Sequence, residues 1–157
     1  MESWNGCGSV CCTLHLHSEF HAHMAGASSA SSAFEHAVDS AVRGFHVYQN
    51  VWTPVLNEQL KVIQHHGNSE DQFAVAVCKE APPGPGVTSA TTIIGHLPRE
   101  ISRLCWYFMQ HDGEILCTIT DNNLRRSPLQ QGGLEIPCRL RFLGKKKNIK
   151  KLKKLLT

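Results

Sequence analysis

Short alternating segments, each closed by a chain breaker, constrain this chain more than any other feature. The stretch FAVAVCKE (73–80) alternates small residues with larger apolar ones, which predicts a β-strand, and APPGPG (81–86) after it cannot be regular structure. The same reasoning predicts further strands over GFHVYQNV (44–51), NEQLKVIQHH (57–66), TTIIGHL (91–97), EILCTITDN (114–122) and EIPCRLRFLG (135–144). The segment FEHAVDSAV (34–42) fits either a strand or a short helix.

Two helices are predicted beside these strands. Pro98 suits the first turn of a helix, and REISRLCWYFMQ (99–110) spaces its apolar residues at helical intervals, ending before Gly113. The tail 144–157 repeats this helical spacing with lysines in between. Strands without βαβ alternation predict a mainly β fold with flanking helices, in the form of a small OB-like β-barrel.

The first 33 residues differ from the rest. AGASSASSA (25–33) is low in complexity, and CGSVCCTLHLHSEFHAH (7–23) holds three cysteines and four histidines. The spacing of these residues matches no common zinc module, so we predict a flexible leader over 1–33 and a domain over 34–157. Zinc binding by the leader stays the alternative.

The seven cysteines indicate a reducing compartment. Their number is odd, and Cys78, Cys105, Cys117 and Cys138 fall in apolar patterns, which predicts buried free thiols. No apolar run reaches the length of a membrane span, and no basic start precedes an apolar block as in a secretory signal. We therefore expect an intracellular protein with no membrane partner, located in the nucleus.

Positive charge is concentrated at one end of the chain. The net charge is +3, yet the last 14 residues hold seven lysines and no acid, which leaves the rest at −4. Such an asymmetry favours a polyanion or an acidic surface as the partner.

Four stretches, in this order and spacing, resemble the HIRAN domain family, small DNA-end-binding modules of repair ATPases. They are GFHVY (44–48), like the first strand of the family, GNSEDQFAVAV (67–77), IIGHLPREIS (93–102) and IPCRLRFLGKKKN (136–148). The resemblance covers about 44–156. It implies a six-stranded barrel related to the OB-fold, with a pocket for the 3′ end of single-stranded DNA.

The resemblance also implies a set of site residues. Asp71 matches the residue that binds the terminal hydroxyl, His96 one that faces the terminal nucleotide, and Arg99 a phosphate-binding lysine. The predicted nucleic-acid-binding residues are His46, Tyr48, Asn68, Asp71, His96, Arg99, Lys145, Lys146 and Lys147. Trp52 is expected at the rim of the pocket, and the lysine tail on the same side.

Departures from the family pattern support a second interpretation. Val47, Glu70 and Leu134 stand where the family places aromatic residues, and each stacked base is worth about 1–3 kcal/mol. A domain that kept the fold but lost end binding, and serves as a protein-interaction or adaptor module, would have such a sequence. Asn68 and Asp71 would then only tie a turn of the Asx kind.

No catalytic set stands out in the sequence. It has no phosphate loop of the Gly-x-x-x-x-Gly-Lys type and no Gly-x-Ser-x-Gly elbow. We expect a non-catalytic module without cofactor or metal, whose partner is single-stranded DNA or a DNA 3′ end.

Overall fold

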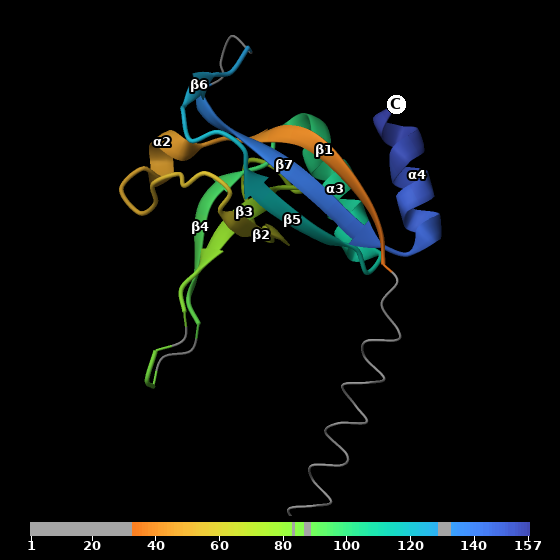
Figure 1. Ribbon diagram of the computed structural model, residues 1–157, viewed down its shortest axis with the longest axis horizontal. Coiled ribbons are helices and arrows are strands. Elements are labelled where there is room, and N and C mark those ends of the chain that lie inside the picture. The colour runs from red at the N-terminus through yellow and green to blue at the C-terminus, as the bar shows by residue number, and fades with distance from the viewer. Residues whose placement is uncertain (1–32, 83, 87–88, 129–132) are drawn as a thin grey trace, which may run out of the picture. The chain divides into compact units, whose positions relative to one another are not determined.

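The strands of the domain form one antiparallel sheet in the computed structural model (Figure 1). The structure describes residues 33–157 except 83, 87–88 and 129–132, so the predicted leader and its cysteines and histidines lie outside the described residues. The described strands are β1 (Phe34–Val42), β2 (Gln59–Gln64), β3 (Val75–Glu80), β4 (Thr91–His96), β5 (Glu114–Ile119), β6 (Arg125–Arg126) and β7 (Leu134–Gly144). The described helices are α2 (Phe45–Tyr48), α3 (Arg99–Gln110) and α4 (Lys146–Leu156).

The strand order is β1-β7-β5-β2-β3-β4, with the short β6 also paired to β7. The two edge strands meet at a single antiparallel bridge between Arg43 and His96, made by backbone hydrogen bonds of 2.8 and 2.9 Å. The predicted mainly β fold with flanking helices is confirmed. The edges of the expected barrel are joined by one bridge and not by a continuous ladder, because β1 ends at Val42 and Gly44 turns the chain away.

The strand predicted over 44–51 is wrong. Gly44 has a left-handed φ of 82°, which starts the short helix α2. Phe45 is buried edge-on against Trp52, while His46 and Val47 are exposed, so the alternation in the sequence does not match two faces of a sheet. The open alternative over 34–42 is settled as β1, which pairs with β7 along its whole length.

The core lies between the sheet and two amphipathic helices. Alternate residues of β5 and β7 are buried in this core, and Phe142 of β7 meets Phe108 of α3 edge to face with ring centroids 5.2 Å apart. In α4, Ile149 and Leu152 are buried while the lysines face outward. This helix begins two residues later than the predicted 144–157 segment. Within the described residues, no helix is long and apolar enough to cross a bilayer.

Four cysteines of the domain are free and buried, as predicted: Cys78, Cys105, Cys117 and Cys138. Burial raises the pKa of Cys105 to about 12, and it also raises the pKa of Cys78. A thiol with a raised pKa holds its proton at neutral pH and is a poor nucleophile. These side chains therefore serve as small core residues.

Candidate nucleic-acid interface

Two histidine rings stack at the ends of β2 and β4. The ring centroids of His65 and His96 are 5.1 Å apart with an interplanar angle of 18°, and His65 Nδ1 lies 2.8 Å from His96 Nε2. One of these nitrogens donates and the other accepts, so each ring fixes the tautomer of the other. The pair is half-buried.

Small residues of the intervening strand allow this contact. In the register of the sheet, His96 lies opposite Ala76, and the backbone N–H of His65 donates to the Ala74 carbonyl. Ala74 and Ala76 share a face of the strand because they are two positions apart. Both are alanines, so no bulk keeps the two rings apart.

The turn after β2 is held by two polar side chains. Asn68 Oδ1 accepts hydrogen bonds from the backbone N–H groups of Glu70 and Asp71, at 2.9 and 3.1 Å. Asp71 Oδ1 accepts one from the N–H of Phe73 at 2.9 Å. These are Asx-type bonds, so the turn role foreseen for Asn68 and Asp71 is present. Asp71 Oδ2 accepts no hydrogen bond from the described residues.

The start of α3 is fixed against this turn. Ser102 Oγ donates to the Phe73 carbonyl at 2.7 Å, and Arg99 Nη2 donates to the Glu70 carbonyl at 3.3 Å. The guanidinium of Arg99 is thereby held beside the turn while it stays exposed. Two strand ends, a turn and the start of a helix meet here, and we call this group of residues the strand-end site. Its members are His65, Asn68, Asp71, His96 and Arg99.

The strand-end site contains hydrogen-bonding groups of both charges. Asp71 supplies a carboxylate acceptor, Arg99 a cationic donor, and the histidines supply ring nitrogens. Tyr48 of α2 lies next to the site, with its ring centroid 6.2 Å from that of His96. Among residues 33–157 as described, no group of three or more His, Cys, Asp or Glu side chains is arranged to hold a metal ion.

The environment of His96 disfavours its cationic form. Burial lowers the pKa of His96 from its ordinary value of 6.5, His65 lowers it further, and Asp71 acts in the opposite direction. The folded domain therefore binds this proton less firmly than the unfolded chain does. Neutral His96 therefore contributes to the stability of the folded domain. This contribution is fully present above pH 6.5 and is lost as the pH falls from 6.5 through the pKa of His96 in the folded domain.

We predict that acidification destabilises the parent domain through His96. The urea midpoint should fall between about pH 7.5 and pH 5.5, and the fall should be smaller in His96→Asn, which has no ring to protonate. His46→Asn, at an exposed position of α2, controls for the loss of an imidazole. An equal fall in the parent and in His96→Asn would contradict the assignment.

The structure does not bring every predicted residue to this place. His46 is exposed and lies near Gly133, where an added Cβ would be 3.4 Å from its Nδ1. Trp52, expected at the rim, is only 4% exposed and donates its Nε1–H to Glu58 at 3.0 Å, because its ring fills the core beside α2.

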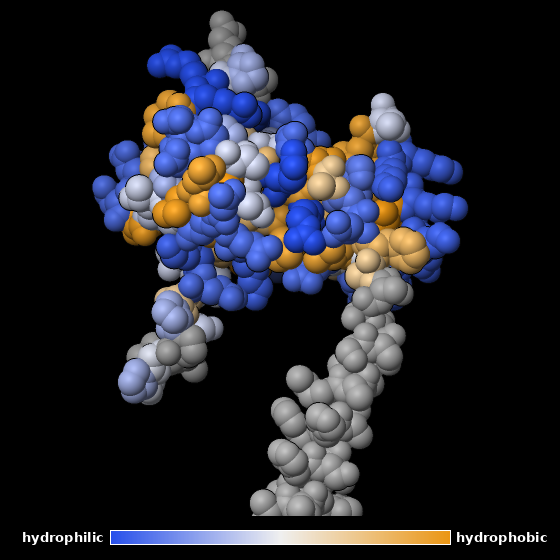
Figure 2. Space-filling model, in the orientation of Figure 1, coloured by the Kyte–Doolittle hydropathy of each residue, from blue (hydrophilic) through white to orange (hydrophobic). Residues whose placement is uncertain are grey.

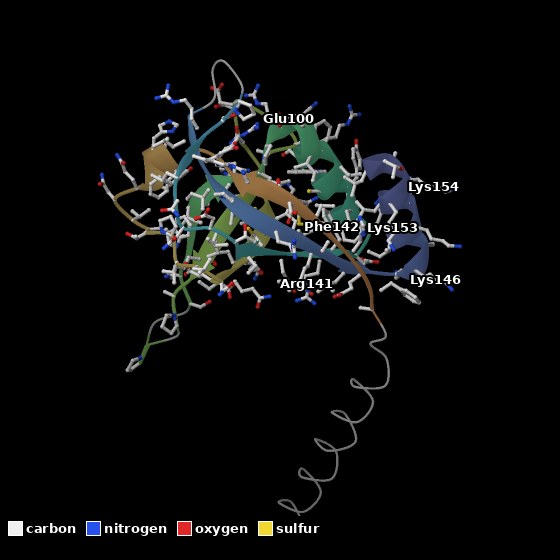
Figure 3. All side chains as sticks on the ribbon, turned by 45° about the horizontal axis from the view of Figure 1, so that its top comes forward. Glu100, Arg141, Phe142, Lys146, Lys153 and Lys154 are labelled. Atoms are coloured by element: carbon white, nitrogen blue, oxygen red, sulfur yellow. The ribbon has the colours of Figure 1, made fainter. Side chains whose placement is uncertain are left out.

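The lysine tail, expected beside the pocket, lies elsewhere. Lys145 pairs with Asp112 at 3.1 Å, beyond the C-terminal end of α3, whereas Arg99 stands at its first residue. Lys146 lies over the Phe34 ring at 5.5 Å, and Lys147 follows it on α4. Figure 3 shows Lys146, Lys153 and Lys154 on α4 and Glu100 at the other end of α3. The separation arises because α4 begins beyond the C-terminal end of α3 and packs beside Tyr107 and His111.

One residue of the site, His65, and one residue next to it, Arg43, were missed in the sequence. His65 could have been found from its place just before the Asn68–Asp71 turn, which folds it over the next strand. Arg43 bridges His96 through its backbone, and its side chain binds Glu100 at 2.9 Å and Glu135 at 3.2 Å. These partners are 57 and 92 positions away, so no local signal predicts them.

Comparison with known proteins identifies the fold. No protein-family model and no curated protein matches the sequence. The crystal structure of the HIRAN domain of human HLTF matches with a TM-score of 0.53 at 19% identity, covering 74% of this chain and 82% of that one. A crystal structure of a protein from Lactobacillus plantarum matches with a TM-score of 0.45 at 15% identity, covering 71% of this chain and 100% of that one. The domain over 34–157 therefore has the fold of the HIRAN domain.

Proposed function

We propose that this domain is a non-catalytic module that binds single-stranded nucleic acid and holds its 3′ end in the strand-end site. The observation that carries the proposal is the placement of Asp71. One of its oxygens ties the turn, the other accepts no bond from the described residues, and His96 and Arg99 stand nearby. The likeness to the HIRAN domain of human HLTF supports nucleic acid as the ligand class.

Asp71 can distinguish two kinds of strand end because its negative charge attracts a hydroxyl group and repels a phosphate. A terminal 3′-hydroxyl donates a hydrogen bond to the carboxylate. A 3′-phosphate in the same place would put two anions side by side in a half-buried site, where repulsion is poorly screened. In this proposal Arg99, which is exposed at the start of α3, pairs with the last internal phosphate.

The experiment compares short oligothymidylates that end in a 3′-hydroxyl or a 3′-phosphate, by fluorescence anisotropy at fixed salt. We expect the parent to prefer the hydroxyl end and Asp71→Asn to narrow the ratio of the two dissociation constants about tenfold, as for one charged hydrogen bond. Asparagine keeps an oxygen for the Phe73 N–H, so the turn is retained.

Glu70→Gln is the matched control for Asp71→Asn. It removes the same charge from the neighbouring residue, whose side chain is exposed and whose backbone alone takes part in the turn. It should strengthen binding to both ends alike and leave their ratio unchanged. A parent that binds both ends equally would overturn end recognition and leave binding along the strand in place.

An adaptor module on the same fold is the second candidate, and one observation favours it. The segment from α2 to β2 exposes four apolar side chains between half and two thirds of their surface: Val47, Val51, Val55 and Leu56. Hydrophobic residues gather near α2 in Figure 2. Exposed apolar side chains gathered in one region are typical of a protein-binding surface. A parent that binds no oligonucleotide would favour this candidate.

A further inference from the structure

The exposed face of α3 links the strand-end site to the lysine helix. Arg99, Arg103 and Tyr107 are four positions apart, so they lie in one row along the helix, and His111 follows at its end. All four are exposed, with Tyr107 at 41%. We call these residues the α3 stripe.

An aromatic surface with a cationic cover occupies the middle of the α3 stripe. The guanidinium of Arg103 lies 5.0 Å from the centroid of Phe73 and 5.9 Å from that of Tyr107, and the two rings are 5.6 Å apart. Phe73 itself comes from the turn that holds Asp71. Aromatic rings beside arginines are the groups on which unpaired bases stack.

The stripe continues into a pocket between α3 and α4. This pocket has a volume of about 140 Å³ and is lined by Tyr107 and His111 from one side and by Asn148, Lys151 and Leu155 from the other. Lys147 and Lys154 stand four residues before and three after Lys151, on the same face of α4. Figure 2 shows a hydrophilic edge over α4.

The two carboxylates at the ends of α3 are already paired. Glu100, at the start of α3, accepts hydrogen bonds of 2.9 and 3.1 Å from Arg43, and Asp112 binds Lys145. Glu70 is exposed next to Arg99, at the strand-end site only. From Arg103 to Lys151 the surface therefore presents cations and rings to an incoming phosphate backbone.

We propose that the α3 stripe is a track for single-stranded nucleic acid, which leads from the strand-end site to the lysines of α4. The proposal rests on the proposed function, because the track begins where the 3′ end is held. Bases stack on Phe73 and Tyr107, Arg103 covers them, and Lys147, Lys151 and Lys154 pair with phosphates further along the strand.

The length of α3 sets the number of nucleotides. Twelve helical residues span about 18 Å, and stacked nucleotides advance about 3.4 Å each, so the track holds about five nucleotides. A trinucleotide then covers about 10 Å, from the strand-end site past Arg103 but short of Tyr107, and a nonanucleotide reaches the lysines as well.

The test measures anisotropy of 5′-labelled oligothymidylates with a 3′-hydroxyl, three and nine nucleotides long. The parent should bind the longer strand more tightly and with a steeper salt dependence. Tyr107→Ala and Arg103→Gln should each weaken binding of the nonanucleotide about tenfold, as expected when one base stack or its cationic cover is removed, while the trinucleotide keeps its preference for a hydroxyl end. Tyr107→Phe should restore binding, because it keeps the ring.

Arg139→Gln is the matched control for Arg103→Gln. It removes the same charge from the outward face of β7, where Arg139 pairs with Asp39. Because this position lies outside the α3 stripe, the affinity for the nonanucleotide should change only by the small effect of one positive charge less. Thermal unfolding of each variant separates loss of binding from loss of structure.

Four outcomes would overturn the track. The first is a parent that prefers hydroxyl ends but binds both lengths equally, which leaves the proposed function standing. The second is that Arg103→Gln and Tyr107→Ala behave as Arg139→Gln does. The third is that the parent binds an acidic peptide but not the nonanucleotide, and that Tyr107→Ala abolishes binding of the peptide. The surface would then be a peptide site. Failure of both oligonucleotides to bind would overturn the proposed function together with the track.

Discussion

Gly95→Ala is expected to lower the free energy of unfolding by about 3 kcal/mol and to pull the strand-end site apart. A Cβ at Gly95 would lie 2.4 Å from Val42 Cγ1 and 2.7 Å from the Arg43 carbonyl oxygen. The second neighbour is backbone, so no change of rotamer relieves the clash. The strands must separate where Arg43 and His96 form the bridge between the two edges of the sheet.

Gly84→Ala is the matched control for this prediction. Gly84 lies in the connection between β3 and β4, where an added Cβ meets no atom within 4 Å. Urea unfolding of both variants gives the difference in stability, and the preference for hydroxyl ends reports on the site. If Gly95→Ala unfolds at the urea concentration of Gly84→Ala, the edges of the sheet do not meet as described.

This glycine illustrates what could be predicted from the sequence. The segment IIGHLP resembles a family pattern, and that resemblance marks the position of the glycine without giving a cause for it. The cause is the close approach of Arg43, which is 52 positions earlier in the chain. Such a contact between distant segments depends on the order of the strands in the sheet. Local periodicity of the sequence does not predict that order.

The helices and strands, too, could be predicted where their cause is local in the sequence and could not where the cause is distant or conformational. β5, β7 and α3 could be predicted because their apolar residues repeat at the period of the element they form. The segment 44–51 also alternates, yet the positive φ of Gly44 bends it into α2, and alternation does not report a dihedral angle. The burial of Phe45 and Trp52 then decides which side faces the core.

The candidate site also combines contacts that are local in the sequence, which could be predicted, with distant contacts, which could not. The turn held by Asn68 and Asp71 could be predicted because each bond spans two or three residues. The pairing of His65 with His96 spans 31 residues and requires alanines on the strand between them. The neutralisation of Arg43 by Glu100 and Glu135 requires three separate elements to meet, which the sequence does not indicate.

The tail of the chain combines two roles that substitutions can separate. Leu152 is 2% exposed and packs with the core under α4, so Leu152→Ala should lower the free energy of unfolding by about 2–5 kcal/mol. Removing the whole tail would abolish this packing together with the charges. The triple variant Lys147→Gln, Lys151→Gln, Lys154→Gln removes charge from the exposed face alone.

The two variants should have opposite effects in two measurements. The glutamine variant should unfold within about 0.5 kcal/mol of the parent for each exposed position changed. Its binding of a nonanucleotide should depend less steeply on salt, by about 0.7 in the logarithmic slope for each phosphate that no longer pairs with a lysine. Leu152→Ala should keep the steep slope at a temperature where it is folded. If the glutamine variant keeps the full slope, the lysines only face water, and the basic tail stabilises the domain through its leucines and isoleucine alone.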